Sequence, residues 1–390
     1  MVMNGRRVVI TGVGAVAAPG IGIDDLWKGM QEAPGPAPRV ITDWDPEPWI
    51  PKREHRRLDR FSQFALVATD EAISQAGQQE IVPEEVGVAV ATGIGGLESL
   101  ESLVWAAAED EPRPPPFIIP MMMGNAAAAA VSIKYGFGGQ VSSPVAACAG
   151  GSQSVLDGLR QIQWGYADVF VVGGAEAAAT NACREGFRAA RALSTSGYAR
   201  PFDVDRDGFV TGEGAGILIL ESAEFAEARG ATPLAEVLGG ASTADAYHVT
   251  APHPEGTGAE RAIRMALKDA DLEPGDISYI NAHGTGTGLN DQTEGMVIGR
   301  VFGDNQPPVS SIKGTTGHGF GASGSIEAAV TIEAMRRRQL PPNMGLNNQD
   351  PEIPLTDIVT EARDWEPGPA LSNSFGFGGH NTVLAFGPIS

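Results

Sequence analysis

A regular alternation of strand-like and helix-like segments, along all 390 residues, most constrains the fold of this chain. Short apolar runs such as residues 7–11 and 277–281 have the length and composition of buried strands. Between such runs, apolar side chains recur at helical spacing, as in residues 148–164 and 325–338. This alternation predicts an α/β protein in which helices pack on layered sheets.

The strand-helix rhythm occurs twice, and the second round begins near Ala231. Two rounds of roughly 200 residues suggest a duplication at the level of topology, although no sequence repeat proves it. We find no flexible interdomain linker between the two rounds. We therefore predict two halves, residues 1–230 and residues 231–390.

Charge and cysteine content exclude several classes of protein. With 27 Lys and Arg against 48 Asp and Glu, the formal net charge of −21 opposes non-specific binding to nucleic acid or anionic lipid. Cys148 and Cys183 are too few for a disulfide framework and fit a reducing compartment. The longest apolar stretch, residues 117–131, contains a proline, a glycine and an asparagine and is a poor membrane span. We expect a cytoplasmic protein without nucleic-acid or membrane partners.

Cys148 is a candidate nucleophile because it lies in the run Cys-Ala-Gly-Gly, at the start of a predicted helix. The positive end of the helix dipole and the free N–H groups there favour the thiolate, and the glycines let a substrate approach. The alternative is a small buried core cysteine, which is the commoner role of a lone cysteine.

Two histidines follow predicted strands, which is a typical place for catalytic side chains. His283 lies in NAHGTGT, and His318 lies with Lys313 in SSIKGTTGHG. Two such histidines together with Cys148 suggest that both imidazoles donate to one oxygen. Structural roles are expected for the other histidines considered: His55, His248 and His253.

These motifs resemble those of the elongating β-ketoacyl-acyl carrier protein synthases. VAACAGG, NAHGTGT and SIKGTTGHGFGASGSIEAA carry the resemblance, and residues 200–216, 245–252 and 373–381 continue it in the same order. The resemblance covers essentially the whole chain. It implies the thiolase-like α/β fold, with two duplicated halves in α-β-α-β-α layers, normally as a dimer.

The resemblance also implies residue roles. Cys148 would accept the acyl chain as a thioester, and His283 and His318 would polarise the carbonyl of a malonyl thioester, where enolate charge develops. Lys313 and Glu327 would support the histidines, although either could be a surface charge. The N–H groups of Cys148 and Phe377 would form an oxyanion hole, with Phe377 as a gate; from the residues alone, its loop is an ordinary turn. The enzyme itself would need no metal or organic cofactor.

The expected partner is an acyl carrier protein. Thr250, Thr285 and Thr287 match positions that bind the phosphopantetheine arm, or else simply cap loops, and Phe375 is a further substrate-binding candidate. The main basic cluster, residues 52–60, matches the start of the family's carrier-docking helix, although a charge run is usually a solvated face. Its candidates for binding the carrier are Lys52, Arg53, Arg56 and Arg57. The dimer would form with an identical chain or with a homologue resembling a chain-length factor.

The pathway is less constrained, because the motifs mix fatty-acid and type II polyketide features. We favour a polyketide or polyene pathway, with housekeeping fatty-acid elongation as the alternative. The chain departs from common family patterns at Ala-Gly-Gly after Cys148, at Ala251 and at Gly286. These departures concern details of the substrate pocket.

Three other classes of protein remain possible. A dinucleotide-binding oxidoreductase is suggested by Gly12-Val-Gly14 and by Gly319 to Gly324, but both glycine patterns are weak. A degradative thiolase needs a second cysteine late in the chain, where this sequence has His380. A non-catalytic chain-length subunit usually lacks the nucleophile, whereas Cys148 is present.

Overall fold

A computed structural model describes residues 5–78, 80–108 and 115–389. Across these residues, most strands form one mixed sheet in the order β4-β3-β5-β6-β1-β7-β13-β12-β8-β9, with β2 paired to β1. Strands β10 and β11 form a separate small sheet. The bounds are β1 Val8–Ala17, β2 Gly20–Ile21, β3 Gly87–Ala91, β4 Val141–Ser142, β5 Val169–Glu176, β6 Gly214–Ser222, β7 Ala235–Ala244, β8 Tyr279–Asn281, β9 Val309–Ser310, β10 Gln339–Leu340, β11 Arg363–Asp364, β12 Ala370–Gly376 and β13 His380–Gly387.

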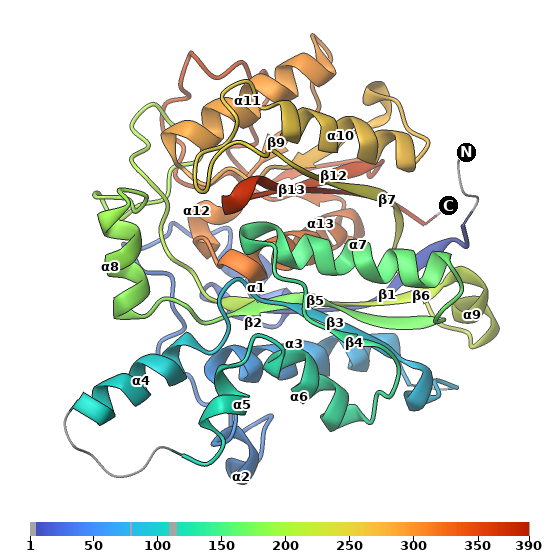
Figure 1. The fold of residues 1–390 in the computed structure, drawn as a ribbon. Helices are drawn as coiled ribbons and strands as arrows, with labels where there is room; N and C mark the ends of the chain where they lie inside the picture. The colour runs from blue at the N-terminus through green and yellow to red at the C-terminus, as the bar shows by residue number, and fades with distance from the viewer. Residues whose placement is uncertain (1–4, 79, 109–114, 390) are drawn as a thin grey trace.

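The two ends of the main sheet have the same topology. At one end β4, β3 and β5 are parallel, and β6 and β1 follow as antiparallel neighbours. At the other end β9, β8 and β12 are parallel, followed by antiparallel β13 and β7. The two halves of the sheet join in its middle, where β1 pairs with β7 through two residue pairs, Val9 with Glu236 and Ile10 with Ala235. The sheet therefore lies in two layers, which confirms the duplicated, thiolase-like α/β fold (Figure 1).

Two helices lie between the sheet layers, α7 (Gly150–Gln163) and α13 (Ser323–Arg337) (Figure 1). In α13, every residue from Ser323 to Met335 is buried, as expected for a helix covered on all sides. The outer faces are covered by other helices. These are α3 (Arg60–Ala76) and α6 (Ala126–Tyr135) on the N-terminal layer, and α10 (Thr257–Asp269) and α11 (Gly288–Phe302) on the C-terminal layer.

The remaining α-helices are short or lie at the edges of the layers. The apolar stretch, residues 117–131, divides between α5 and α6. The break falls at Gly124 and Asn125, whereas Pro120 lies inside α5. Among the described residues, no helix is both long and apolar enough to cross a membrane. The bounds are α1 Ile23–Gly29, α2 Lys52–His55, α4 Leu97–Ala108, α5 Ile118–Met122, α8 Asn181–Ala189, α9 Ala223–Ala228 and α12 Lys313–Thr316.

The first glycine pattern of the oxidoreductase alternative has a packing role. Gly12 and Gly14 lie inside β1, where a Cβ atom would come within 2.0 Å of the carbonyl oxygens of Ala72 and Ala68 on α3. These glycines let the helix approach the strand, so they form no phosphate-binding turn.

Candidate active site

A cavity of about 570 Å³ brings together residues from both halves of the chain. Cys148 reaches it from the start of α7, His283 from the turn after β8, and His318 from the turn after α12. Phe375 and Phe377 line it from the end of β12 and the following turn. The structure thus gathers side chains that lie more than a hundred residues apart in the sequence.

Cys148 lies in a single 3-10 turn, Ala147–Ala149, directly before α7. The preceding Ala147 has φ 46°, a left-handed conformation that costs an alanine about 1–3 kcal/mol. The thiol is buried, and burial raises its pKa to about 11. The main-chain donors lower the pKa of the thiol, as expected, but the loss of water outweighs them, so the resting thiol is protonated at pH 7.

His318 is the immediate partner of the thiol. Its Nε2 lies 3.0 Å from Cys148 Sγ, and its Nδ1 lies 3.1 Å from the hydroxyl of Ser323. That hydroxyl also accepts the N–H of Gly319 over 2.9 Å. Burial and the charge of Lys313 lower the pKa of His318 well below 6.5. The imidazole is therefore neutral at pH 7, and a neutral ring beside a thiol can accept its proton.

His283 is held from behind by Lys313. The ammonium Nζ lies 3.3 Å from Nδ1 and donates to the His283 carbonyl oxygen over 2.6 Å. Because Lys313 donates to Nδ1, the proton of the neutral ring sits on Nε2. Burial, Lys313 and His318 lower the pKa of His283 well below 6.5. The two imidazole centroids are 5.4 Å apart, so both rings face a common small volume.

Lys313 and Glu327 form a buried ion pair behind the two histidines. Both side chains are 1% exposed, and neither lines the cavity. Burial raises the pKa of Glu327 to about 7 although Lys313 opposes this shift. The surface alternative for these two charges is thereby excluded, because the pair is internal.

The turn after β12 packs directly on Cys148. The N–H groups of Phe377 and of Cys148 itself are directed at the thiol, and each lowers its pKa. A Cβ atom at Gly376 would lie 3.0 Å from the Cys148 nitrogen, so glycine permits this approach. This segment is more than an ordinary turn, because it brings the Phe377 N–H to the sulfur, beside the N–H of Cys148 itself.

Aromatic rings form the wall of the cavity beside His318. Phe209 and Phe320 pack on the imidazole with centroid distances of 5.3 and 5.2 Å. Phe187 stacks on Phe320 at 5.1 Å and lies 6.1 Å from Phe377. Such a wall excludes water and strengthens electrostatic interactions at the thiol.

The three candidate threonines also line the cavity. Thr285 is buried, and its hydroxyl lies 2.9 Å from that of Thr287, which caps α11 by accepting the N–H of Asn290. Thr250 is exposed, with its hydroxyl 3.3 Å from His248 Nδ1. Thr287 therefore has a capping role at the start of α11, and all three threonines line the cavity.

The basic candidates lie elsewhere. Lys52, Arg53, Arg56 and Arg57 are exposed on α2 and the turn after it, and none of them lines the cavity. Lys52 pairs with Glu47 at 2.8 Å, and the guanidinium of Arg57 lies 4.6 Å from the centre of the Phe117 ring.

Two carboxylates of α11 that the sequence reasoning missed fix the His283 loop. Glu294 accepts the N–H groups of His283 and Gly284, each over 2.8 Å. Asp291 accepts the N–H of Thr285 over 3.0 Å and also that of Gly286, whose φ of 80° requires glycine. The signal was the pair of acidic residues in the first two turns of the helix that follows NAHGTGT.

Comparisons with known proteins match this chain to one enzyme family. Two family models match, the "Beta-ketoacyl synthase, N-terminal domain" at residues 39–226 and the "Beta-ketoacyl synthase, C-terminal domain" at residues 234–347. A "3-oxoacyl-[acyl-carrier-protein] synthase 2" from Synechocystis sp. is 45% identical over 98% of each chain.

Two solved structures share the whole fold. The ishigamide ketosynthase/chain length factor matches with a TM-score of 0.93 and 32% identity, over 99% of this chain and 100% of that one. A type II polyketide acyl-carrier protein complex with its ketosynthase bound to the hexaketide matches with a TM-score of 0.90 and 30% identity, over the same shares.

Proposed function

The chain belongs to the β-ketoacyl synthase family, and from that membership we propose how its residues divide the work of condensation. It is an acyltransferase that joins an acyl group to a malonyl unit carried on acyl carrier protein, as a 3-oxoacyl-acyl carrier protein synthase does. The observation that carries the assignment of roles is the 3.0 Å contact between Cys148 Sγ and His318 Nε2, with His283 beside it.

In the first half-reaction, Cys148 takes the acyl group from a carrier thioester. His318 accepts the thiol proton, since a thiol with a pKa of about 11 is about 1 part in 10,000 ionised at pH 7. The sulfur attacks the acyl carbonyl, and the carrier thiol leaves with a proton. The Ser323 hydroxyl both accepts and donates, so it can support either tautomer of His318 during this transfer.

In the second half-reaction, the malonyl thioester loses carbon dioxide. The electron pair of the broken carbon-carbon bond moves towards the thioester oxygen and forms an enolate. His283 presents its Nε2 proton to that oxygen because Lys313 occupies Nδ1, and His318 supplies the second donor. The resulting enolate carbon attacks the acyl carbonyl on Cys148. A carbon-carbon bond forms, the Cys148 thiolate leaves and is reprotonated, and the chain is two carbons longer.

Each acyl transfer passes through a tetrahedral oxyanion. We assign its stabilisation to the N–H groups of Cys148 and Phe377, which converge on the sulfur. The Phe377 ring, which is half-buried beside Phe187, is the proposed gate.

We place the phosphopantetheine arm of the carrier along Thr250, Thr285, Thr287 and Phe375, because all four line the cavity. Docking of the acidic carrier is assigned to Lys52, Arg53, Arg56 and Arg57, whose side chains are exposed in a strongly acidic protein. The protein would act as a dimer, with itself or with a homologue of the chain-length-factor type; the ishigamide ketosynthase is paired with a chain length factor.

We place the reaction in fatty-acid elongation rather than in a polyketide or polyene pathway. The motifs alone had favoured the polyketide pathway. The 45% identity to a 3-oxoacyl-acyl carrier protein synthase exceeds the 30–32% identity to the two polyketide-type structures, and supports the alternative. We retain the division at residue 230, with the nucleophile in the first half and the histidines in the second.

The test is intact-protein mass spectrometry after brief exposure to acyl carrier proteins loaded with saturated chains or with polyketide intermediates. The proposal predicts a thioester adduct on Cys148, formed fastest with unbranched saturated chains, and no adduct on a Cys148→Ala variant. An adduct on Cys183, or an unchanged adduct in the variant, would contradict the role of Cys148. Faster loading of polyketide intermediates would restore the polyketide pathway.

A further inference from the structure

Glu176 is a buried carboxylate that the proposed reaction does not use. It ends β5 and is fully buried. The hydroxyl of Thr92 donates to its Oε1 over 3.0 Å, and the N–H groups of Gly93 and Gly321 donate to its Oε2 over 2.6 and 3.1 Å. None of these described partners is a cation. A buried carboxylate is tolerated only when donors replace its lost water, so this one is built to hold two main-chain segments.

The two segments that Glu176 joins both line the reaction cavity. The turn after β3 contributes Gly93 and Ile94, and the 3-10 turn Phe320–Ala322 contributes the Phe320 ring. Their backbones are in direct contact, because a Cβ atom at Gly321 would lie 2.2 Å from the Gly93 nitrogen. The second weak glycine pattern thus serves close packing beside the thiol.

Phe320 depends on this anchor. Its φ of 43° is a left-handed conformation that a bulky side chain rarely adopts. The N–H that Glu176 holds belongs to the next residue, Gly321. In this conformation the Phe320 ring packs on the His318 imidazole at 5.2 Å.

We propose that Glu176 is a positioning residue for the acylation of Cys148, which holds the Phe320 turn and thereby fixes the His318 imidazole against the thiol. The inference deepens the proposed function and rests on it. Glu176 touches neither the substrate nor the sulfur, and it acts through Phe320 and His318.

The negative charge of Glu176 opposes the acylation of Cys148, whereas its position supports it. Its carboxylate raises the pKa of the Cys148 thiol, so removing the charge alone would ease acylation. Burial raises the pKa of Glu176 itself to about 7, so the carboxylate is increasingly ionised above neutral pH. A loss of acylation after neutralisation therefore reports the lost position rather than the lost charge.

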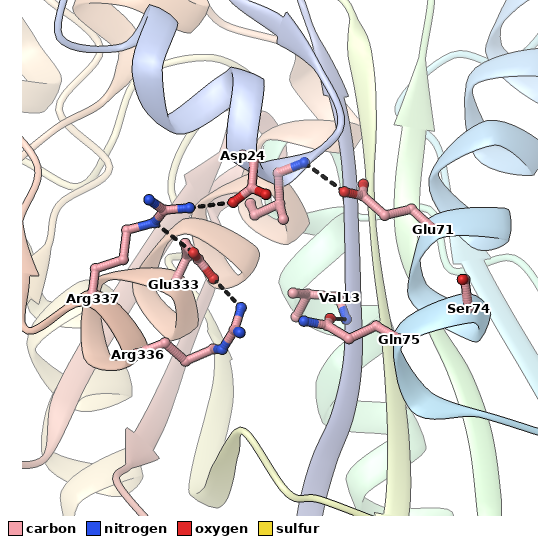
Figure 2. A pocket seen from close by; sticks show the side chains of 9 residues that line it. Val13, Asp24, Glu71, Ser74, Gln75, Glu333, Arg336 and Arg337 are labelled. Carbon is pink, nitrogen blue, oxygen red and sulfur yellow. Dashed lines mark hydrogen bonds and ion pairs between the residues drawn. The ribbon is translucent and has the colours of Figure 1, made fainter.

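Glu71, on α3, offers a matched control in a cavity that does not contain Cys148. It also joins two main-chain segments, accepting the N–H of Ala15 over 3.0 Å and that of Ile23 over 2.8 Å. It is half-buried, burial raises its pKa, and it lines a different cavity (Figure 2). Glu71→Gln makes the same chemical change away from Cys148.

The experiment compares Glu176→Gln and Glu71→Gln by rapid-quench acylation from an acyl carrier protein, with the affinity for the carrier and thermal unfolding measured in parallel. We expect Glu176→Gln to slow acylation about 10- to 100-fold. The affinity for the carrier should stay within about twofold of wild type, because the variant displaces groups beside the thiol and not the surface that binds the carrier. The Glu71→Gln protein is expected to be acylated at the wild-type rate, with a loss of melting temperature comparable to that of Glu176→Gln.

Glu176→Asp keeps the charge but is one methylene shorter, and it provides the second variant should the Gln protein fail to fold. Slow acylation of the Asp protein supports the proposal. Wild-type acylation in either Glu176 variant, or an equal loss in Glu71→Gln, overturns it. Absence of any Cys148 adduct in the wild-type protein would instead overturn the proposed function.

Discussion

Two cavities of similar volume gather different kinds of side chain. The first gathers a thiol and two imidazoles that are uncharged, and the second gathers ion-paired side chains. The cavity around Cys148 measures about 570 Å³, and a second one, between β1, α1, α3 and α13, measures about 500 Å³ (Figure 2). In the second cavity, Glu333 accepts hydrogen bonds from Arg336 over 2.6 Å and from Arg337 over 2.5 Å. Arg337 also pairs with Asp24. These four ionic groups satisfy one another, and the pair of Arg337 with Asp24 links α13 to α1.

The first cavity keeps its reactive groups uncharged. Burial raises the pKa of the Cys148 thiol and lowers that of each histidine, so a neutral acid faces a neutral base at pH 7. The charges of Lys313 and Glu327 lie behind the imidazoles, out of the cavity. The comparison teaches that two cavities of similar volume can differ in chemistry, because of these two only the first gathers a buried thiol beside two neutral imidazoles.

The largest effect is expected from the histidines. His283→Ala or His318→Ala should slow malonyl decarboxylation by about 100- to 10,000-fold, because each removes a donor from the developing enolate. Carbon dioxide release from malonyl carrier protein measures this. Ser74→Ala, a change in the second cavity, is the control and should leave the rate unchanged. Equal losses in the control would erase the distinction between the cavities.

The pH dependence of thiol alkylation should be the next largest effect. In a Cys183→Ala background, the rate of modification by iodoacetamide should rise about tenfold per pH unit from pH 7.5 to 9.5, because the thiolate fraction grows up to a pKa of about 11. The sign follows from the shift, since a raised thiol pKa delays ionisation to higher pH. A rate that levels off below pH 9 would show that burial does not control this thiol.

The smallest effect on activity is expected from the ion pairs of the second cavity. Glu333→Gln should lower the free energy of unfolding by about 1–3 kcal/mol, since the Glu333 side chain is 3% exposed and holds two guanidinium groups. Condensation activity at 25 °C should stay within about twofold of wild type. Urea denaturation and a steady-state assay check both values. A loss of activity at unchanged stability would give this cavity a role in catalysis.

Sequence motifs indicated the thiol and the two imidazoles that the cavity brings together, but not the groups that hold them. Cys148, His283 and His318 could be predicted because each lies in a distinctive local motif at the end of a strand or the start of a helix. Ser323 and Asp291 were missed because a serine or an aspartate near a helix start usually caps it. Glu176 was missed because its partners lie 83 and 145 positions away along the chain.

The net pKa of the thiol could not be predicted for a related reason. A helix start is visible in the sequence, and it does favour a thiolate. The desolvation that outweighs it comes from burial in the folded chain. Phe209, Phe320 and Phe377, which line the same cavity, come from three separate segments. The two glycine patterns, which were weak as dinucleotide-binding signals, have a packing explanation, since Gly12 and Gly321 are required by close packing.

The most direct test of the account is a single turnover with malonyl carrier protein labelled with carbon-13 at the free carboxyl group. The protein is first loaded with an acyl chain on Cys148, and labelled carbon dioxide and the 3-oxoacyl carrier product are followed together. We predict equal amounts of both, with loss of the Cys148 adduct at the same rate. Formation of the product without loss of that adduct, or with the label retained in it, would contradict the account.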